Sequence, residues 1–430
     1  MREMKDSGIE WVGAIPAAWG VHRIASHFQE IKEKNTANAY SNALQFKMGK
    51  IIAKPQKWDE DETNETYSAY TVVHPNTIMI NGLNLEFDFV TQRVARVECN
   101  GIITSAYIAL SPRDDINAEY ICYLLKSYDA CRAFHSMGRG LRKILSYSEL
   151  KNKPIVVPPL AEQERIAAFL DAECAEIDAV LEKTRASIEE YKKLKQAVIT
   201  QAVTKGIRGD RPMKDSGIEW IGEIPAEWTA SKIKYCTEFA PSCNTSHLSE
   251  DSLVTFTPME CIKNGYFENR EAHFSALSSS YTQYQDGDIV FAKVTPCFEN
   301  GNIAIMQGLS AGVGFGSSEL FVIRPQSINT EFIFYYLQND IFKQYACATM
   351  TGTGGLKRVS PTFVRNYSVF IPCNEEQLEI VRYLNEKCSG IEVLIAKKQQ
   401  YLTEIENYKK SLIYEYVTGK KEVKTSVLAD

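Results

Sequence analysis

Two stretches of the chain combine lysine and arginine with glycine, as loops that bind phosphate do. Residues 131–153 contain six cations and one acid, and residues 343–365 contain four cations and no acid. Each stretch holds a glycine-rich turn, Gly138-Arg139-Gly140 in the first and Gly352-Thr353-Gly354 in the second. Glycine lets backbone N–H groups approach a phosphate, and a basic side chain neutralises its charge. Although the net charge of the chain is −6, the local charge predicts a DNA-contacting loop in each stretch.

The candidate DNA-binding residues lie in these loops and directly after one predicted strand of each half, at 77–80 and 288–291. Arginine can form two hydrogen bonds with guanine, and other polar side chains contact base edges or phosphates. The alternative is a surface loop whose charges balance neighbouring acids, but two such loops at equivalent positions favour DNA. The predicted set is Arg139, Gly140, Arg142, Lys143, Thr353, Gly354, Lys357, Arg358, Asn81 and Lys293, with Asn84 and Asn300 as further members.

Several motifs of catalytic and metal sites are missing from the sequence. The glycine-rich residues 308–318 lack the lysine of a P-loop, and HExxH does not occur. The one Pro-Pro pair, Pro158-Pro159, does not belong to the Asn-Pro-Pro-Tyr-like tetrapeptide expected of an adenine methyltransferase. The eleven cysteines form no CxxC pair, so we interpret them as small buried residues in a reducing compartment. We therefore expect no catalytic centre and no metal site.

The sequence begins without the apolar region of a secretory signal, and no run approaches the roughly 18 apolar residues that span a bilayer. Its content of 44% hydrophobic and 24% charged residues is typical of a folded protein. These features predict a soluble, cytoplasmic protein without membrane contact.

An internal repeat organises the whole chain. Residues 4–19 (MKDSGIEWVGAIPAAW) and 213–228 (MKDSGIEWIGEIPAEW) are identical at thirteen of sixteen positions. In each half, an asparagine, Asn117 or Asn329, is the expected N-cap of a short helix. The tryptophans of the repeated segment are expected to be buried anchors that dock each globular part to a helix end: Trp11, Trp19, Trp220 and Trp228.

A long helical pattern follows each globular part, from about residue 162 to 204 and from about 376 to 418. Its apolar residues recur three and four apart, which is the signature of a coiled coil. Two such helices bury their seams most simply against each other, and the repeat implies an antiparallel pair; the alternative is that each helix packs on its own globular part. Thr184 and Lys398 would then meet near the midpoints, where a polar pair could fix the register. The first seam is Ile166, Leu170, Cys174, Ile177, Leu181, Thr184, Ile188, Tyr191, Leu194 and Val198, and the second consists of the residues 214 positions later, from Ile380 to Tyr408 and Leu412.

This pattern resembles the DNA-specificity subunit of type I restriction–modification systems over essentially the whole chain. The matching motifs are the repeated opening KDSGIEWxGxIPxxW, the junction PPLAEQERIAAFLD (158–171) with its echo IPCNEEQLEIVRYLN (371–385), and the helix ends LKQAVITQAVTKG (194–206) and YKKSLIYEYVTGK (408–420). The second junction departs from the usual proline-rich form, without an expected effect on function.

The repeat and the resemblance together imply an α+β fold with pseudo-two-fold symmetry. Two similar target recognition domains of mixed α/β structure, residues 1–158 and 208–373, would be separated by two long helices, residues 159–207 and 374–430 with the tail, that form an antiparallel coiled coil. The resemblance implies that each domain reads one half of an asymmetric, bipartite site in double-stranded DNA, and that the helices set the distance between the half-sites.

The resemblance also implies partner proteins, namely two methyltransferase (modification) subunits and restriction subunits with translocase and nuclease activity. S-adenosylmethionine, ATP and Mg are expected on those partners, and no cofactor is expected on this chain. Two alternatives stay open at this point. The chain could serve a methyltransferase–nuclease fusion of another restriction class, or it could be a coiled-coil adaptor that spaces two protein-binding domains without contacting DNA.

Overall fold

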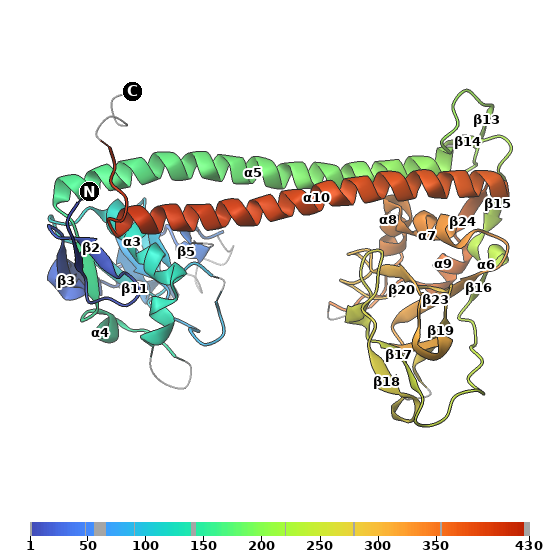
Figure 1. Cartoon of the computed structure of the whole chain (residues 1–430), viewed down its shortest axis with the longest axis horizontal. Coiled ribbons are helices and arrows are strands. Elements are labelled where there is room, and N and C mark those ends of the chain that lie inside the picture. The colour runs from blue at the N-terminus through green and yellow to red at the C-terminus, as the bar shows by residue number, and fades with distance from the viewer. Residues whose placement is uncertain are drawn as a thin grey trace. The chain divides into compact units, whose positions relative to one another are not determined.

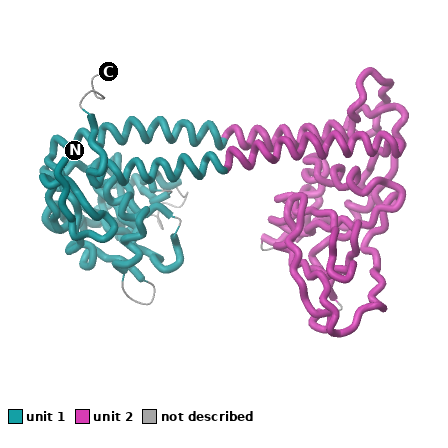
Figure 2. Tube along the Cα trace, viewed as in Figure 1, with its two compact units in different colours: residues 1–185, 400–430 teal, residues 186–399 magenta. Residues whose placement is uncertain are grey.

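The computed structural model describes residues 2–47, 49–55, 66–89, 91–138, 143–219, 221–277, 280–352 and 355–424. The chain divides into two compact units, which Figure 2 colours separately. Unit 1 consists of residues 1–185 and 400–430, and unit 2 consists of residues 186–399. Each unit therefore contains a globular part and portions of both long helices, α5 (Leu160–Lys205) and α10 (Asn374–Val417).

An antiparallel four-stranded sheet forms the centre of the globular part of unit 1. Its order is β4 (Phe28–Glu30), β11 (Ile108–Pro112), β8 (Ile78–Ile80) and β9 (Val94–Arg96). Side chains alternate between the two faces of a strand, so Ile78 and Ile80 of β8 join the main core while Met79 joins a smaller cluster. Helix α3 (Ala118–Ala130) adds Ile121 and Leu124 to the main core.

The remaining elements of unit 1 are short strand pairs and short helices around this sheet. The strand pairs are β1 (Met4–Asp6) with β2 (Ala14–Pro16), β3 (Gly20–Arg23) with β12 (Pro154–Val157), β5 (Leu44–Lys47) with β6 (Lys50–Ala53), and β7 (Thr71–Val73) with β10 (Gly101–Ile103). The short helices are α1 (Ile24–His27), η1 (Ala133–Ser136) and α4 (Tyr147–Leu150).

Unit 2 repeats the central sheet of unit 1 with the same strand order. The sheet consists of β16 (Thr237–Phe239), β23 (Leu320–Pro325), β20 (Ile289–Ala292) and β21 (Ile303–Ile305), as Figure 1 shows in part. Strand β20 takes the place of β8, which confirms the predicted alignment of 77–80 with 288–291. The predicted N-caps are also confirmed, because the Asn117 side chain accepts from the Tyr120 N–H at 2.8 Å and that of Asn329 from the Phe332 N–H at 3.0 Å.

Each unit carries a second set of strands beside this shared sheet. Unit 2 carries a second four-stranded sheet in the order β18 (Glu271–His273), β17 (Leu253–Thr257), β22 (Val313–Gly316) and β19 (Thr282–Gln285). Its β17–β22 pair is parallel, and unit 1 has the same arrangement in a less regular form, because a parallel bridge between Ala43 and Ile102 joins the β5–β6 pair to the β7–β10 pair. The other elements are β13 (Met213–Asp215), β14 (Glu223–Pro225), β15 (Thr229–Lys232), β24 (Ser368–Ile371), α6 (Ile233–Cys236), α7 (Thr330–Gln338), α8 (Asp340–Ala348), α9 (Pro361–Asn366), η2 (Met259–Cys261), η3 (Phe274–Ala276) and η4 (Ser310–Gly312).

In each unit the two long helices lie side by side and run antiparallel (Figure 1). In unit 1, Lys409 pairs with Asp178 at 2.6 Å, and further along α5 Arg185 pairs with Glu406, also at 2.6 Å. In unit 2, the Lys195 ammonium lies 2.5 Å from the Glu392 carboxylate. As the residue number of the α5 partner rises from one ion pair to the next, the residue number of the α10 partner falls, which confirms the predicted antiparallel pairing.

Two details of the predicted seam are wrong. Thr184 donates its hydroxyl to the Val180 carbonyl at 2.8 Å, whereas the Lys398 ammonium lies 5.7 Å from the centre of the Tyr191 ring. Each of the two residues therefore has another partner than the one predicted. Leu194 and Tyr408, the same position in the two repeats, are exposed rather than buried. A helix turns once in about 3.6 residues, so a seam that repeats every 3.5 residues drifts across its surface.

The repeated opening segment attaches each globular part to the ends of both helices. The Trp19 indole N–H donates to Glu162 at 3.1 Å, and the Trp228 indole N–H donates to Glu376 at 3.1 Å, so each tryptophan contacts the first turn of a long helix. Trp19 and Trp228 are buried, Trp11 is partly buried, and Trp220 lies outside the described residues. The anchoring role predicted for the repeated tryptophans is thus confirmed where the structure describes them.

Two lysines extend this attachment to the other helix end. At the end of α10, Lys420 donates to the Val12 carbonyl at 2.8 Å, and at the end of α5, Lys205 donates to the Ile221 carbonyl at 2.8 Å. Val12 and Ile221 occupy the same place in the two copies of the opening segment. Each opening segment therefore holds the start of one long helix and the end of the other, which explains its near identity in the two repeats.

All eleven cysteines are free thiols, and five of them are buried. The prediction that the cysteines are buried is wrong for Cys99, Cys131 and Cys373, which are exposed. Cys131 directly follows helix α3, and Cys373 lies in the link between β24 and α10, where the backbone runs along the surface.

Candidate nucleic-acid interface

In unit 1, the loop that follows the central strand β8 is hydrogen-bonded to the end of the basic stretch. The Leu145 N–H donates to the Gly82 carbonyl at 2.9 Å, and the Leu85 N–H donates to the Lys143 carbonyl at 3.3 Å. The two backbones approach so closely that a Cβ at Gly82 would collide with the Leu145 carbonyl oxygen, which explains the glycine. Asn81 and Lys143, which the sequence singled out separately, are therefore on neighbouring segments.

Unit 2 has the same arrangement after its central strand β20. The Thr295 N–H donates to the Lys357 carbonyl at 3.0 Å, the Lys357 N–H donates back to the Thr295 hydroxyl at 3.1 Å, and the Val359 N–H donates to the Lys293 carbonyl at 2.9 Å. Lys293, Lys357 and Arg358 thus lie together at the junction of the two segments. We name this junction the strand–loop edge: residues 81–85 with 143–145 in unit 1, and 293–295 with 355–359 in unit 2.

The cations of the strand–loop edge differ in their freedom to meet a ligand. Lys143 and Lys357 are exposed, and neither takes part in an ion pair within the described parts of the chain. Arg358 instead forms a two-pronged pair with Glu319, with distances of 2.7 Å from Nη2 and 2.9 Å from Nε. Lys293 is half-buried and donates to the Ser318 carbonyl at 2.7 Å, and burial lowers the pKa of its ammonium.

The alternative interpretation, that loop charges balance neighbouring acids, therefore fits Arg358 better than it fits Lys357. The Glu319 carboxylate lies beside both Arg358 and Lys293, and the hydrogen bond from Arg358 lowers the pKa of Glu319. Asn81 also has an internal partner, since its side-chain oxygen accepts from the Leu83 N–H at 3.1 Å. Five of the predicted residues lie outside the described residues: Arg139, Gly140, Arg142, Thr353 and Gly354.

Sequence reasoning missed the residue that shapes the strand–loop edge of unit 1. Arg93 is fully buried, and its guanidinium donates to the carbonyls of Leu83 at 2.6 Å, Asp88 at 2.6 Å, Asn81 at 3.2 Å and Asn84 at 3.4 Å. Its backbone N–H donates to the Asp129 carboxylate at 2.7 Å. A single arginine thus holds the turn from residue 81 to residue 88, and no motif in the sequence signals it.

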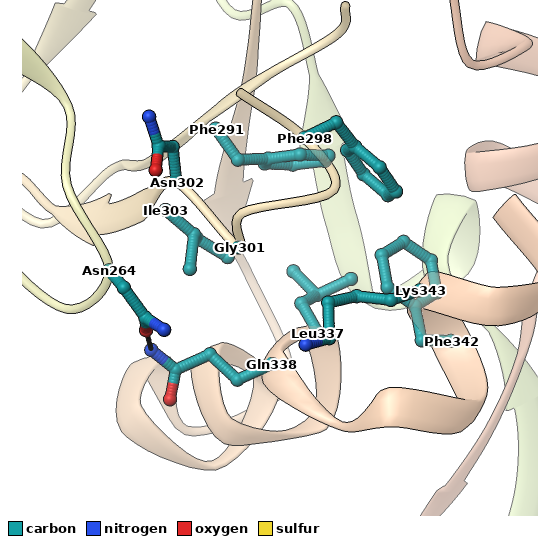
Figure 3. Close-up of a pocket in the computed structure, with 10 residues that line it drawn as sticks. All are labelled: Asn264, Phe291, Phe298, Gly301, Asn302, Ile303, Leu337, Gln338, Phe342 and Lys343. Carbon is teal, nitrogen blue, oxygen red and sulfur yellow. Dashed lines mark hydrogen bonds between the residues drawn. The ribbon is translucent and has the colours of Figure 1, made fainter. Parts of the chain in front are cut away.

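The pocket of unit 2 in Figure 3 lies between α7, α8 and the loop after β20. Two side chains at its rim, Gln338 and Asn264, form a hydrogen bond of 3.3 Å. Its volume of about 20 Å³ has room for about one water molecule, so it cannot hold a nucleobase or a cofactor as it stands. Its lining residues are Asn264, Phe291, Phe298, Gly301, Asn302, Ile303, Leu337, Gln338, Phe342 and Lys343.

Within the described ranges, no group of three or more His, Cys, Asp or Glu side chains is arranged to hold a metal ion. Within the same ranges, no helix is both long enough and apolar enough to cross a membrane.

Several known proteins are similar to this chain. Among curated relatives, the EcoEI type I restriction enzyme specificity subunit of Escherichia coli is 33% identical over 189 residues, which are 42% of this chain and 32% of the relative. The chain therefore matches about a third of that relative's length. The MjaVIII type I restriction enzyme specificity subunit of Methanocaldococcus jannaschii is 24% identical over 428 residues, covering 95% of this chain and 94% of the relative.

A solved structure shows the same fold. It comes from work on complex assembly and conformational transition of the type I restriction–modification system, and it matches with a TM-score of 0.70 over 95% of this chain and 99% of the other, at 14% identity. Residues 99–190 and 242–406 match the family described as the type I restriction modification DNA specificity domain. The two matched regions contain both basic stretches and portions of both long helices. This chain therefore belongs to the family of type I restriction–modification DNA-specificity subunits.

Proposed function

We propose that this specificity subunit reads an asymmetric, bipartite DNA site, one half with each unit, and that it carries no catalytic centre of its own. The observation that carries the proposal is the strand–loop edge, which places exposed lysines, Lys143 and Lys357, at equivalent positions of the two units. An exposed lysine that contacts a phosphate releases counterions, so binding must weaken as salt rises.

The difference between the units supports the asymmetry of the proposed site. The central sheet and the attachment of the helices are shared, whereas the side chains at the strand–loop edge differ. The strand–loop edge of unit 1 carries Asn81 and Lys143, and that of unit 2 carries Lys293 and Lys357 with an acid, Glu319, beside them. Different side chains on a common frame recognise different base sequences, because specificity comes from contacts to base edges.

The two long helices act in this proposal as a spacer between the half-sites. They contain 46 and 44 residues and pack antiparallel, so bending them would break many side-chain contacts. A stiff spacer converts helix length into a fixed number of base pairs between the two contacts.

We further propose that the helix pair docks two methyltransferase subunits. Each unit has one set of two exposed apolar side chains on the long helices, Val180 with Tyr408 in unit 1 and Leu194 with Leu394 in unit 2. The two sets are copies of each other in the repeat, because Leu394 lies 214 residues after Val180 and Tyr408 lies 214 residues after Leu194. The register of the ion pairs places the two residues of each set at about the same level of the helices. Repeated exposed apolar positions at matching levels fit two copies of one partner.

The chemistry would then belong to the partners. S-adenosylmethionine would be bound by the methyltransferase subunits, and ATP and Mg by restriction subunits with translocase and nuclease activity. A methyltransferase–nuclease fusion could take the place of both types of partner, and co-purification of the subunits encoded beside this chain would distinguish these cases.

A binding assay of the chain with its partner methyltransferase tests the proposal. Sequencing of methylated adenines in a host with and without this chain identifies the recognised site, and a duplex with that site serves as the probe. We expect binding that weakens as salt rises. Lys357→Ala should weaken this binding and reduce the slope of log K against log salt by about one. Binding that does not respond to salt, or a host whose methylated sites are unchanged by this chain, would instead indicate the protein-binding adaptor.

A further inference from the structure

We infer that Phe87, in the turn that Arg93 holds, makes an apolar contact with the bases of the half-site read by unit 1. This inference rests on the proposed DNA-reading function and names a specificity-determining residue within it. The Phe87 side chain is 78% exposed, the highest value among the large apolar residues described.

One exposed apolar residue is ordinary on a protein surface, so exposure alone does not carry the inference. The turn beneath Phe87 is unusual because it is held by a fully buried arginine, whose guanidinium donates to the carbonyls of residues on both sides, Leu83 and Asp88. Charged side chains are almost never fully buried unless they are paired or hydrogen-bonded, as the two terminal nitrogens of Arg93 are. A turn fixed in this way presents Phe87 at a defined position, which lowers the entropy cost of a contact with a ligand.

The neighbouring aromatic residue has a different surrounding. The ring of Phe89 stacks on His135 with centroids 5.0 Å apart and an interplanar angle of 10°, and the Arg132 guanidinium lies 5.3 Å from its centre. His135 also contacts the Asp88 carbonyl at 3.2 Å. Phe89 therefore packs the end of the turn against His135 of η1, while the ring of Phe87 is exposed to solvent.

The position of the turn makes DNA the occupant that fits. Gly82 and Leu85 are hydrogen-bonded to the segment of Lys143, and Leu85 lies two residues before Phe87, so the exposed ring lies in the same loop as the strand–loop edge of unit 1. Arg132 adds a second cation beside Phe89, at the end of the turn. An exposed apolar ring in a loop that also contacts cationic residues matches a duplex, since cations contact phosphates while the ring contacts a thymine methyl group or partly enters a base step.

The experiment measures affinity for two duplexes, one with the mapped site and one with a scrambled site, using the full chain with its partner methyltransferase. We expect Phe87→Ala to weaken binding of the mapped site by roughly 5- to 100-fold, the range of one aromatic–base contact. The scrambled site should lose much less, the salt dependence should stay unchanged, and Phe87→Leu should retain part of the affinity. Lys143→Ala should instead weaken both duplexes and reduce the salt slope by about one.

Tyr235→Ala is the matched control, because Tyr235 is a 70% exposed aromatic residue in α6 of unit 2, apart from its strand–loop edge. In the host, Phe87→Ala should broaden the methylated sequence in one half-site and leave the other half unchanged. The inference is overturned if Phe87→Ala binds the mapped site within twofold of the unchanged chain, weakens both duplexes equally, or lowers the melting temperature. Absence of salt-sensitive binding by the unchanged chain is a separate result, which overturns the proposed function itself.

Discussion

The attachment of the globular part of unit 2 to α10 should depend on a buried ion pair, and its copy in unit 1 provides a matched comparison. Glu376 lies 2.6 Å from Arg211, and their side chains are 1% and 9% exposed. The copy, Glu162 with Arg2, is 14% and 28% exposed. Removing one member of a buried pair costs about 3–5 kcal/mol, whereas exposed pairs contribute about 0–1 kcal/mol.

The substitution Glu376→Gln keeps the volume of the side chain and an acceptor for the Trp228 indole, which donates at 3.1 Å. Arg211 also keeps a weaker partner, Glu227 at 3.2 Å. We therefore expect a loss of about 2–4 kcal/mol in the free energy of unfolding of unit 2, below the full cost of an orphaned charge. Glu162→Gln should cost about 1 kcal/mol in unit 1, because this pair is partly solvated.

Urea unfolding followed by hydrogen exchange of peptides from each unit measures the two losses separately. Trp228→Phe is the control for the indole, and should cost about 1 kcal/mol because one hydrogen bond is lost and the ring stays buried. Equal losses for the two glutamine variants would refute the argument from burial. A loss of unfolding free energy in unit 1 after Glu376→Gln, which changes unit 2, would also refute it.

Three further perturbations act on features described above. Arg93→Met should destabilise unit 1 by about 3 kcal/mol and speed hydrogen exchange in residues 81–88, since several buried carbonyls lose their donor; unchanged exchange would contradict the role of Arg93. Glu319→Gln should tighten binding of the mapped duplex several-fold by releasing Arg358. The ion pair itself lowers the pKa of Glu319, so it should add a small stability that is present above pH ~4.5 and lost as pH falls through the lowered pKa. Seven residues inserted near the middle of both α5 and α10 keep the apolar seam in phase and lengthen the helix pair by about 10 Å. The mapped half-sites should therefore move apart by about 3 base pairs, and an unchanged recognition site would argue against a spacer.

The architecture could be predicted because its determinants are local in the sequence. Heptad spacing, the repeated opening segment and the N-cap residues Asn117 and Asn329 each act within a few residues of their own position. Leu194 and Tyr408 are exposed because the predicted seam moves across the helix surface along the helix. This exposure depends on which helix surfaces are in contact, and the heptad spacing of the sequence does not specify that.

The site could be predicted only in part, for a similar reason. Composition located the basic stretches, but their hydrogen bonds to the loops after β8 and β20 join residues that are about 60 positions apart. A fully buried arginine such as Arg93 runs against the general preference of charged residues for the surface. The internal partner of Asn81 and the pairing of Arg358 with Glu319 likewise depend on the folded backbone.

The core of unit 1 draws on two distant parts of the chain, since Ile9 and Trp19 share it with Leu412, Val417 and Val423. The core of unit 2 is complete between Ile199 and Cys388. During synthesis at about 5–20 residues per second, the nascent unit 1 must wait on the order of 10 to 50 seconds for its closing helix, while unit 2 can already fold on the ribosome. The unit that is translated first is therefore the last to complete its fold. A premature stop before residue 412 would keep every one of its candidate DNA-contact residues yet leave its core incomplete.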